Sequence, residues 1–385
     1  MAESQRTFKV ELPSQRGKIF SADNFPLVDN QEGYLVYADL TKLENPISAA
    51  AKLAPILEVE EEIIKERLMN PDLAWVALKR KARKEVKTKI DSLGIDGIGF
   101  EKESIRFYPE ASLSAHLLGF VGSDESGNDK GYFGIEGYYD LELKGRSGML
   151  YQEKDASGKP ILVGRFERQE AIDGRDLVLH LDRAVQFMIE EELEKGIEKY
   201  GAKSGSVILL EPQSGAVLAM ASIPSYGPKN FRNYDKSLYK NPVVADAFEP
   251  GSIFKVITMA AALNEGVITP ETRCDKCDGP RKIGPDIIHT YDDQYYPDST
   301  VKEILEHSDN VGMVFIAEKL GKEKSIEYIK RFGFGSLTGV DLEEEMTPFL
   351  RPDKEWREID LAAAAFGQGI AITSIQMVRA AAAIA

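Results

Sequence analysis

Apolar residues recur at the spacing of one helical face from Val185 to Ile197. This period predicts a helix over residues 184–200. Asp182 stands directly before it, where a carboxylate can accept a free backbone N–H of the first turn. The segment before the helix, Asp176–Leu181, has the pattern of a strand.

Two short apolar segments, Ser206–Leu210 and Ala216–Ala221, follow this helix. The turn residues between them, with Gly215 last, predict a β-hairpin. A strand, a long helix and a hairpin in this order indicate an α+β fold, in which helices pack on an antiparallel sheet.

The pattern beyond Gly251 is mainly helical. Residues 252–263 are strongly apolar and end at Asn264-Glu265-Gly266, a typical helix stop. Further helices are predicted over residues 301–307, 312–319 and 322–332. The last residues, Ser374–Ala385, are rich in alanine and break off within a helical pattern. We therefore expect the domain to continue past this chain.

The first half of the chain is irregular and mixed in charge. Strand-like pieces at Lys18–Phe20 and Tyr34–Tyr37 flank residues 47–92, which are rich in Glu, Lys and Leu and are predicted to be helical. This half shows no arrangement of catalytic residues. The pattern changes near Gly174, which predicts two domains, residues 1–170 and residues 171–385.

Composition and charge exclude several classes of function. The 385 residues are 43% hydrophobic and 29% charged, as in ordinary globular proteins. The formal net charge of −15 argues against a nucleic-acid binder, because attraction to phosphates gives such proteins most of their affinity. No run of 18 apolar residues occurs, and the first residues lack the apolar core of a signal peptide.

The two cysteines, Cys274 and Cys277, are separated by two residues in a polar loop. A structural zinc site needs four ligands, and no second pair of cysteines exists. Two alternatives stay open: a local disulfide, which we expect if the protein is exported, or two free thiols.

Ser252 and Lys255, in the segment Glu-Pro-Gly-Ser-Ile-Phe-Lys, are the first candidates for chemistry. The preceding Pro-Gly predicts a helix that begins at Ser252, where free N–H groups favour a developing anionic oxygen. Lys255 lies one turn on among apolar residues, and burial would lower its pKa until the amine can accept a proton. A neutral lysine can then activate the serine hydroxyl. The spacing alone is weak evidence, since a capping serine and a solvated lysine would share it.

A second element, Ser308-Asp309-Asn310, lies 56 positions after Ser252 between two apolar helical segments. We expect Ser308 to relay protons to the leaving amine, Asn310 to hold the substrate backbone, and Asp309 to point away. Ser-x-x-Lys and Ser-Asp-Asn occur in this order, with a third element Lys-Thr-Gly, in penicillin-binding proteins and class A β-lactamases. No Lys-Thr-Gly, Lys-Ser-Gly or His-Thr-Gly follows Asn310 in this chain.

The chain resembles the class B penicillin-binding proteins, the monofunctional transpeptidases of bacterial wall synthesis, in further segments between residues 16 and 376. An Arg-Gly-x-Ile opening begins at Arg16, although Ser-Ala-Asp-Asn follows it where the family usually has Asp-Arg-Asn-Gly. The other matching segments occur in the family's order. They are Tyr108-Pro109, His116–Gly122, Gly134–Gly137, Leu143-x-Gly145, Gly215–Pro224, Gly367–Gly369 and Thr373-x-x-Gln376.

The resemblance implies an N-terminal pedestal domain of the dimerisation type and a C-terminal transpeptidase domain of the serine acyltransferase fold shared with β-lactamases. It implies that Ser252 attacks the D-Ala-D-Ala bond of a peptidoglycan stem peptide, with Lys255, Ser308 and Asn310 as the other catalytic residues. β-Lactams would acylate the same serine, and no metal or organic cofactor is implied.

The same resemblance implies partners and a location. The expected partners are peptidoglycan stem peptides, β-lactams and a glycosyltransferase of the wall-synthesis machinery. The expected place is the outer side of the bacterial cytoplasmic membrane, held by an N-terminal helix that this chain does not contain.

Other functions stay open from the sequence. A β-lactamase or β-lactam-sensing domain shares the acylation chemistry but lacks a first half of this kind. A non-catalytic wall-synthesis scaffold would need no third motif, and we expect this chain by itself to be inactive. A Ser-His-Asp hydrolase is not supported by the context of the four histidines at 116, 180, 289 and 307. His307 is expected to interact with the C-terminal end of a helix.

Overall fold

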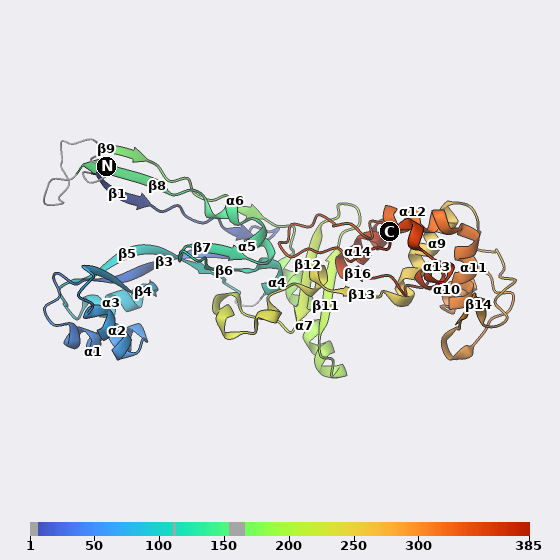
Figure 1. Ribbon diagram of the computed structural model, residues 1–385, viewed down its shortest axis with the longest axis horizontal. Coiled ribbons are helices and arrows are strands. Elements are labelled where there is room, and N and C mark those ends of the chain that lie inside the picture. The colour runs from blue at the N-terminus through green and yellow to red at the C-terminus, as the bar shows by residue number, and fades with distance from the viewer. Residues whose placement is uncertain (1–6, 111–112, 154–165) are drawn as a thin grey trace. The chain divides into compact units, whose positions relative to one another are not determined.

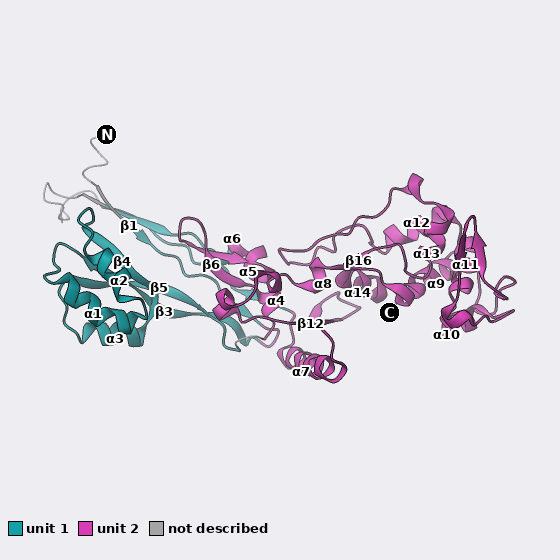
Figure 2. Ribbon diagram, turned by 60° about the horizontal axis from the view of Figure 1, so that its bottom comes forward, with its two compact units in different colours: residues 1–20, 24–111, 141–179 teal, residues 21–23, 112–140, 180–385 magenta. Residues whose placement is uncertain are grey.

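The structure is a computed structural model that describes residues 7–110, 113–153 and 166–385. The chain divides into two compact units that exchange segments (Figure 2). The first contains residues 1–20, 24–111 and 141–179, and the second contains residues 21–23, 112–140 and 180–385. The single boundary predicted at residues 170–171 stays a prediction.

The first unit contains the three longest strands of the described residues, β3, β5 and β4 (Figure 1). Its strands are β1 (Thr7–Leu12), β2 (Ile19–Phe20), β3 (Pro26–Asp39), β4 (Trp75–Arg83), β5 (Ile98–Phe107), β8 (Gly148–Glu153), β9 (Phe166–Gln169) and β10 (Leu177–Val178). Its helices are α1 (Pro46–Leu57), α2 (Glu61–Leu68) and α3 (Lys84–Asp91).

Strand β3 organises the larger sheet of this unit. It pairs antiparallel with β2, β4 and β5, while β10 pairs parallel with β2. The smaller sheet has the order β1-β8-β9. Residues Val36 and Ala38 of β3 pack with apolar residues of α1, α2, α3 and β4 in a buried core. The predicted strand over 176–181 is correct only for Leu177–Val178.

The prediction of one helical stretch over residues 47–92 is wrong in its middle. Helices α1 and α2 form, but β4 follows them and pairs with β3 before α3 begins. Asn70-Pro71-Asp72 ends the helical segment, since proline disfavours a helix at the residue before it. In β4 the buried residues are Leu78 and Ala82, and the lysines and arginines between them stay partly exposed. Because its charged side chains outnumber its buried ones, the sequence of β4 did not indicate a half-buried strand.

The second unit begins with a small layer of α4 (Ala115–Leu118), β6 (Phe120–Ser123), β7 (Asp129–Tyr132) and α5 (Gly134–Tyr138). Helix α6 (Asp140–Lys144) follows in the chain, and all its residues after Asp140 belong to the first unit. An aromatic cluster around Phe120, Tyr226 and Tyr239 joins this layer to the rest of the unit. Carboxylates of Glu343 and Glu344 accept the N–H groups of Phe133 and Gly134. The segments His116–Gly122 and Gly134–Gly137, which carry part of the family resemblance, thus help to build this unit.

Helix α7 (Arg183–Tyr200) packs on a hairpin of β11 (Gly205–Leu210) and β12 (Val217–Ile223), as the hydrophobic pattern predicts. The Asp182 carboxylate accepts the N–H groups of Ala184 and Val185 at 2.9 and 3.0 Å, which confirms the predicted cap. Gln186 is the only fully buried residue of α7, and its amide bonds to both backbone groups of Met220 at 2.8 Å. A polar side chain thus fastens this helix to the sheet.

The remainder of the second unit is mainly helical. The α-helices are α8 (Pro242–Ala245), α9 (Lys255–Asn264), α10 (Val301–Glu306), α11 (Asn310–Leu320), α12 (Lys322–Arg331), α13 (Glu358–Ala364) and α14 (Ser374–Ala382). The short strands are β13 (Ala247–Phe248), β14 (Arg281–Ile283), β15 (Asp286–Ile288) and β16 (Ile372–Thr373). The 3₁₀ segments are η1 (Pro228–Asn233), η2 (Lys236–Leu238), η3 (Gly251–Phe254), η4 (Tyr291–Asp293) and η5 (Asp353–Glu355).

Helices α9 and α11 lie at the centre of this helical part, where α11 also contacts α12 and α13. Buried apolar residues along both helices form its main core, to which Cys274 and Cys277 also belong. These two cysteines form a disulfide, so the first of the two alternatives left open by the sequence is the one present. Among the residues described, no helix has the length and apolar character needed to span a bilayer.

Candidate active site

The segment before Ser252 is held by a later part of the chain. Strand β13 pairs antiparallel with β16, so Phe248 lies opposite Ile372. The pairing continues past the strands, because the Gly251 N–H donates to the Gly367 carbonyl at 2.9 Å. The Glu249 carboxylate accepts the Gly369 N–H at 3.0 Å. Residues 247–251 are therefore braced along their whole length before the chain reaches Ser252.

The helix that carries Ser252 begins differently from the prediction. Ser252 lies in the 3₁₀ turn η3, and the α-helix starts only at Lys255. Gly251 has a φ of +58°, which turns the backbone sharply into η3. Side chains three residues apart are eclipsed in a 3₁₀ turn, so Ser252 and Lys255 lie on the same side. Ser252 is exposed, whereas Lys255 is 1% exposed.

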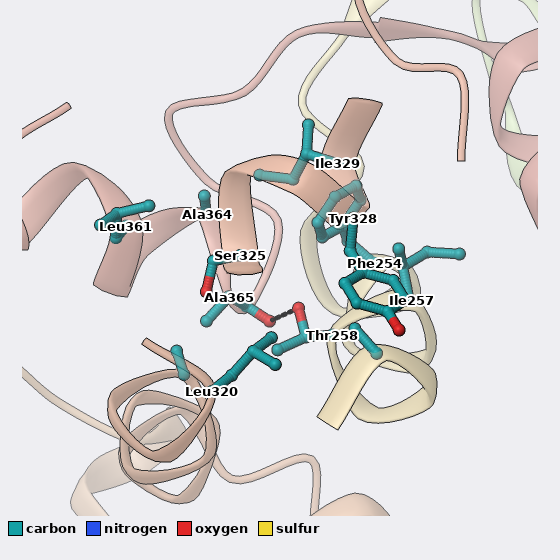
Figure 3. Close-up of a pocket in the computed structure, with 12 residues that line it drawn as sticks. Phe254, Ile257, Thr258, Leu320, Ser325, Tyr328, Ile329, Leu361, Ala364 and Ala365 are labelled. Carbon is teal, nitrogen blue, oxygen red and sulfur yellow. Dashed lines mark hydrogen bonds between the residues drawn. The ribbon is translucent and has the colours of Figure 1, made fainter. Parts of the chain in front are cut away.

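The opposite side of α9 packs into the core and leaves a cavity of about 20 Å³. Figure 3 shows its lining, which is almost entirely apolar and comes from η3, α9, α11, α12 and α13. The Thr258 hydroxyl donates a hydrogen bond to the Ala365 carbonyl oxygen at 3.0 Å. A cavity with room for about one water molecule is a packing gap and not a substrate site.

The predicted triplet Ser308-Asp309-Asn310 forms the connection between α10 and α11. The Ser308 N–H donates to the Leu305 carbonyl, and the Asp309 N–H donates to the Ile304 carbonyl. This pair of bonds is the Schellman motif, in which one residue takes the left-handed conformation that favours glycine. Ser308 occupies that position with a φ of +53°. A serine held at this positive φ is strained, and residues held in strained conformations cluster at functional sites.

The structure brings Ser252, Lys255, Ser308 and Asn310 together. Ser308 Oγ lies 3.1 Å from Ser252 Oγ. Lys255 Nζ donates to Ser308 Oγ at 2.9 Å, to the Ser308 carbonyl at 2.5 Å and to Asn310 Oδ1 at 2.8 Å. No hydrogen bond links Lys255 Nζ with Ser252 Oγ in the described part of the chain. The lysine therefore reaches the first serine through the second one.

The environment of Lys255 makes its amine easier to deprotonate than that of an exposed lysine. Burial lowers the pKa of Lys255 to about 8, and the charge of Asp309 opposes this by raising it. An amine with this pKa is partly unprotonated at neutral pH and can accept a proton. Asp309 is 1% exposed, so it lies inside the protein next to α11 and does not point into solvent.

Asn310 is held at both ends of its amide. Its Oδ1 accepts from Lys255, and its Nδ2 donates to the backbone carbonyl of His289 at 3.1 Å. His289 belongs to the loop that follows the β14–β15 hairpin, and its ring bonds to Asp293 and Tyr295. The ring of His307 stacks flat on Tyr296 of the same loop, with centroids 3.9 Å apart. This loop thus supports the turn that contains Ser308.

Two substitutions of Ser308 distinguish the contribution of its hydroxyl to acylation from the effect of its strained backbone on stability. Ser308→Ala and Ser308→Gly both remove the hydroxyl, so we expect acylation by labelled penicillin to fall about 10²-fold in each. The free energy of unfolding of the glycine variant should be about 1 kcal/mol larger than that of the alanine variant, because glycine adopts positive φ without strain. Acylation rates and denaturant melts of the two variants test this. Wild-type acylation in both would exclude a role for the hydroxyl.

Sequence reasoning missed three groups of this site. They are the Glu249 carboxylate and the backbone of Gly367–Gly369, which hold the segment before Ser252, and the His289 carbonyl, which holds the Asn310 amide. The repeated glycines at 367 and 369 were a signal for a close backbone approach, but nothing in the sequence indicated what approaches. Within the described ranges no cluster of three His, Cys, Asp or Glu side chains could hold a metal ion.

Two family descriptions match almost the whole chain. The penicillin-binding protein dimerisation domain matches residues 11–179, and the penicillin binding protein transpeptidase domain matches residues 205–385. Stage V sporulation protein D of Bacillus subtilis is 33% identical over 99% of this chain and 59% of its own length. Peptidoglycan D,D-transpeptidase FtsI of Escherichia coli is 28% identical over 97% of this chain and 63% of its own length. The chain thus spans about three fifths of these curated relatives.

Solved structures share the fold. Penicillin Binding Protein 2X from Streptococcus thermophilus matches with a TM-score of 0.75 and 23% identity, over 98% of this chain and 59% of that one. A peptidoglycan synthetase from Bifidobacterium adolescentis matches with a TM-score of 0.72 and 27% identity, over 98% of this chain and 73% of that one. Both halves of the fold and the relatives agree with the resemblance in the sequence, and the chain belongs to the class B penicillin-binding proteins.

Proposed function

We propose that this chain carries the acylation centre of a peptidoglycan D,D-transpeptidase, with Ser252 as the nucleophile. The observation that carries the proposal is the line of hydrogen-bonding atoms Ser252 Oγ, Ser308 Oγ and Lys255 Nζ, which ends at a buried amine. Names of relatives such as peptidoglycan D,D-transpeptidase FtsI agree with this chemistry.

The hydrogen-bond line suggests a route for the proton. Neutral Lys255 accepts a proton from Ser308, which in turn accepts the proton of Ser252, and Ser252 Oγ attacks the carbonyl carbon of the D-Ala-D-Ala bond. When the C–N bond breaks, the protonated lysine returns the proton through Ser308 to the leaving D-Ala amine. An ester between Ser252 and the stem peptide remains. The amine of a neighbouring stem then attacks this ester and releases Ser252.

The same centre accounts for β-lactam binding. The lactam carbonyl replaces the D-Ala-D-Ala carbonyl, and the broken C–N bond stays within the opened ring. The Ser252 N–H is one donor to the oxyanion, and we place the second on a strand bearing Lys-Thr-Gly, which is not among residues 311–385. Asn310 has a second amide hydrogen beyond the bond to His289, and we assign it to the substrate backbone.

The remaining proposals concern the whole protein. Residues 1–170 serve as the pedestal and residues 171–385 as part of the transpeptidase domain. The protein works on the outer side of the bacterial cytoplasmic membrane, with stem peptides as substrates and a glycosyltransferase as a partner. A non-catalytic scaffold is less well supported, because a scaffold gains nothing from a buried lysine and a strained serine.

Adduct mapping tests the nucleophile. The protein, produced as its gene encodes it, is incubated with labelled penicillin, digested and analysed by peptide mass spectrometry. The adduct is expected on Ser252, and heat-denatured protein serves as the control that should remain unlabelled. An adduct on another residue, or none in protein with a cooperative melt, would remove the assignment and favour the scaffold.

A further inference from the structure

The middle residue of the triplet, Asp309, has an unusual environment. Its side chain is 1% exposed. Of the described residues, none donates a hydrogen bond of normal geometry to either carboxylate oxygen. Asp309 precedes α11 as its cap residue, but its side chain makes no capping bond. A buried carboxylate without a hydrogen bond is costly unless a nearby charge compensates it.

Lys255 is the complementary case. Its ammonium group is equally buried, and its three acceptors are the neutral oxygens of Ser308 and Asn310. No carboxylate lies within salt-bridge distance of Lys255 in the part of the chain that the structure describes. The two residues that hold Lys255 Nζ are the sequence neighbours of Asp309 on either side. One buried cation and one buried anion therefore share the same few residues of backbone.

We propose that Asp309 is a positioning residue: its carboxylate is the counter-charge of the Lys255 ammonium and sets the pH above which Lys255 can act as a base. The proposal rests on the proposed function only in taking Lys255 as that base. Two opposite charges in a protein interior interact over longer distances than in water, so direct contact is not required.

The electrostatic environment gives the sign of the effect. Burial lowers the pKa of Lys255 to about 8, and Asp309 raises it. Burial raises the pKa of Asp309, while the nearby N–H groups of Gly312 and Val311 and, to a smaller extent, the charges of Lys255 and His307 lower it. The pKa of Tyr295, in the loop beside the turn, is raised by burial and by Asp293, and the charge of Asp309 adds to this increase. Without Asp309, Lys255 would therefore lose its proton at lower pH.

The pH dependence of acylation tests this inference. Rates of acylation by labelled penicillin are measured from pH 5.5 to 9.5 for the wild type and for Asp309→Asn, which keeps the shape and removes the charge. The midpoint at which the rate rises should move down by roughly one pH unit. Glu306→Gln removes an exposed carboxylate at the end of α10 and should leave the midpoint unchanged.

The outcomes separate this inference from the proposed function. An unchanged midpoint in Asp309→Asn, with the adduct still on Ser252, overturns the role of Asp309 and leaves the transpeptidase proposal intact. Absence of an adduct on Ser252 in the wild type overturns the transpeptidase proposal instead.

A second measurement needs no activity. Lys255→Met and Asp309→Asn each leave one buried charge without its partner, so the double variant should melt at a higher temperature than Lys255→Met alone. Additive losses of melting temperature would show that the two side chains are independent and would overturn the inference. The double variant is informative even if one single variant does not fold.

Discussion

Replacing Lys255 with methionine is expected to lower the rate of acylation by labelled penicillin about 10³-fold at pH 8. Methionine is similar in length and suits a buried position, so the main loss is the amine. That amine makes three hydrogen bonds and ends the line that starts at Ser252. Without it, the proton of Ser252 has no acceptor beyond Ser308, and the hydroxyl remains a weak nucleophile.

The pH profile strengthens the test of Lys255. The wild-type rate should rise as pH increases through about 8, because the pKa of Lys255 is lowered to about 8 and the neutral amine is the active form. The residual rate of Lys255→Met should lack this rise. Lys302→Met is a matched control, since Lys302 is largely exposed on α10. A Lys255→Met rate within a few-fold of the control would exclude the lysine as the base.

Replacing Gly367 with alanine is expected to damage the site from a distance. A Cβ at this position would lie 2.0 Å from the Gly251 carbonyl oxygen, and the φ of +82° is unfavourable for alanine. The contact is with backbone, so no side-chain rotation relieves it. We expect the free energy of unfolding to fall by about 2–4 kcal/mol. Acylation should fall about 10²-fold, because a shift of about 1 Å in the serine loop disturbs the reaction geometry.

Gly369 provides the control for this variant. It also has a positive φ, +69°, but the nearest atom to its Cβ would be 3.9 Å away. Gly369→Ala should therefore show the conformational strain alone, about 1 kcal/mol, and keep near-normal acylation. Denaturant melts and acylation rates of both variants give the comparison. Equal effects in the two would mean that the contact with Gly251 is not what makes Gly367 necessary.

The elements that the sequence predicts correctly are those with strong local patterns. The hairpin of β11 and β12, the cap at Asp182 and the helices after Gly251 follow from the period of apolar residues and from short-range hydrogen bonds. Strand β4 was missed because its pairing with β3 is decided by a strand far away in sequence, and its exposed side chains are long and charged. The local spacing of apolar residues carries no information about a pairing partner that is distant in sequence.

The residues of the candidate site also fall into two groups, those that local sequence patterns predict and those that depend on distant contacts. The candidates Ser252, Lys255, Ser308 and Asn310 could be named because their spacing and apolar surroundings are visible in the sequence. The left-handed turn at Ser308 and the burial of Asp309 could not be predicted, since both depend on how α10 and α11 meet. The brace at β13 could not be predicted either, because two-residue strands leave no period to detect.

That brace also has a consequence for how the protein is made. Glu249 and Gly369 are 120 residues apart in the chain. At a synthesis rate of 5–20 residues per second, the ribosome needs roughly 6–24 s to add the second partner after the first. During that interval the nascent chain already contains Ser252, but the backbone that holds its loop does not yet exist. The loop that carries Ser252 can therefore take its final conformation only several seconds after Ser252 has been synthesised.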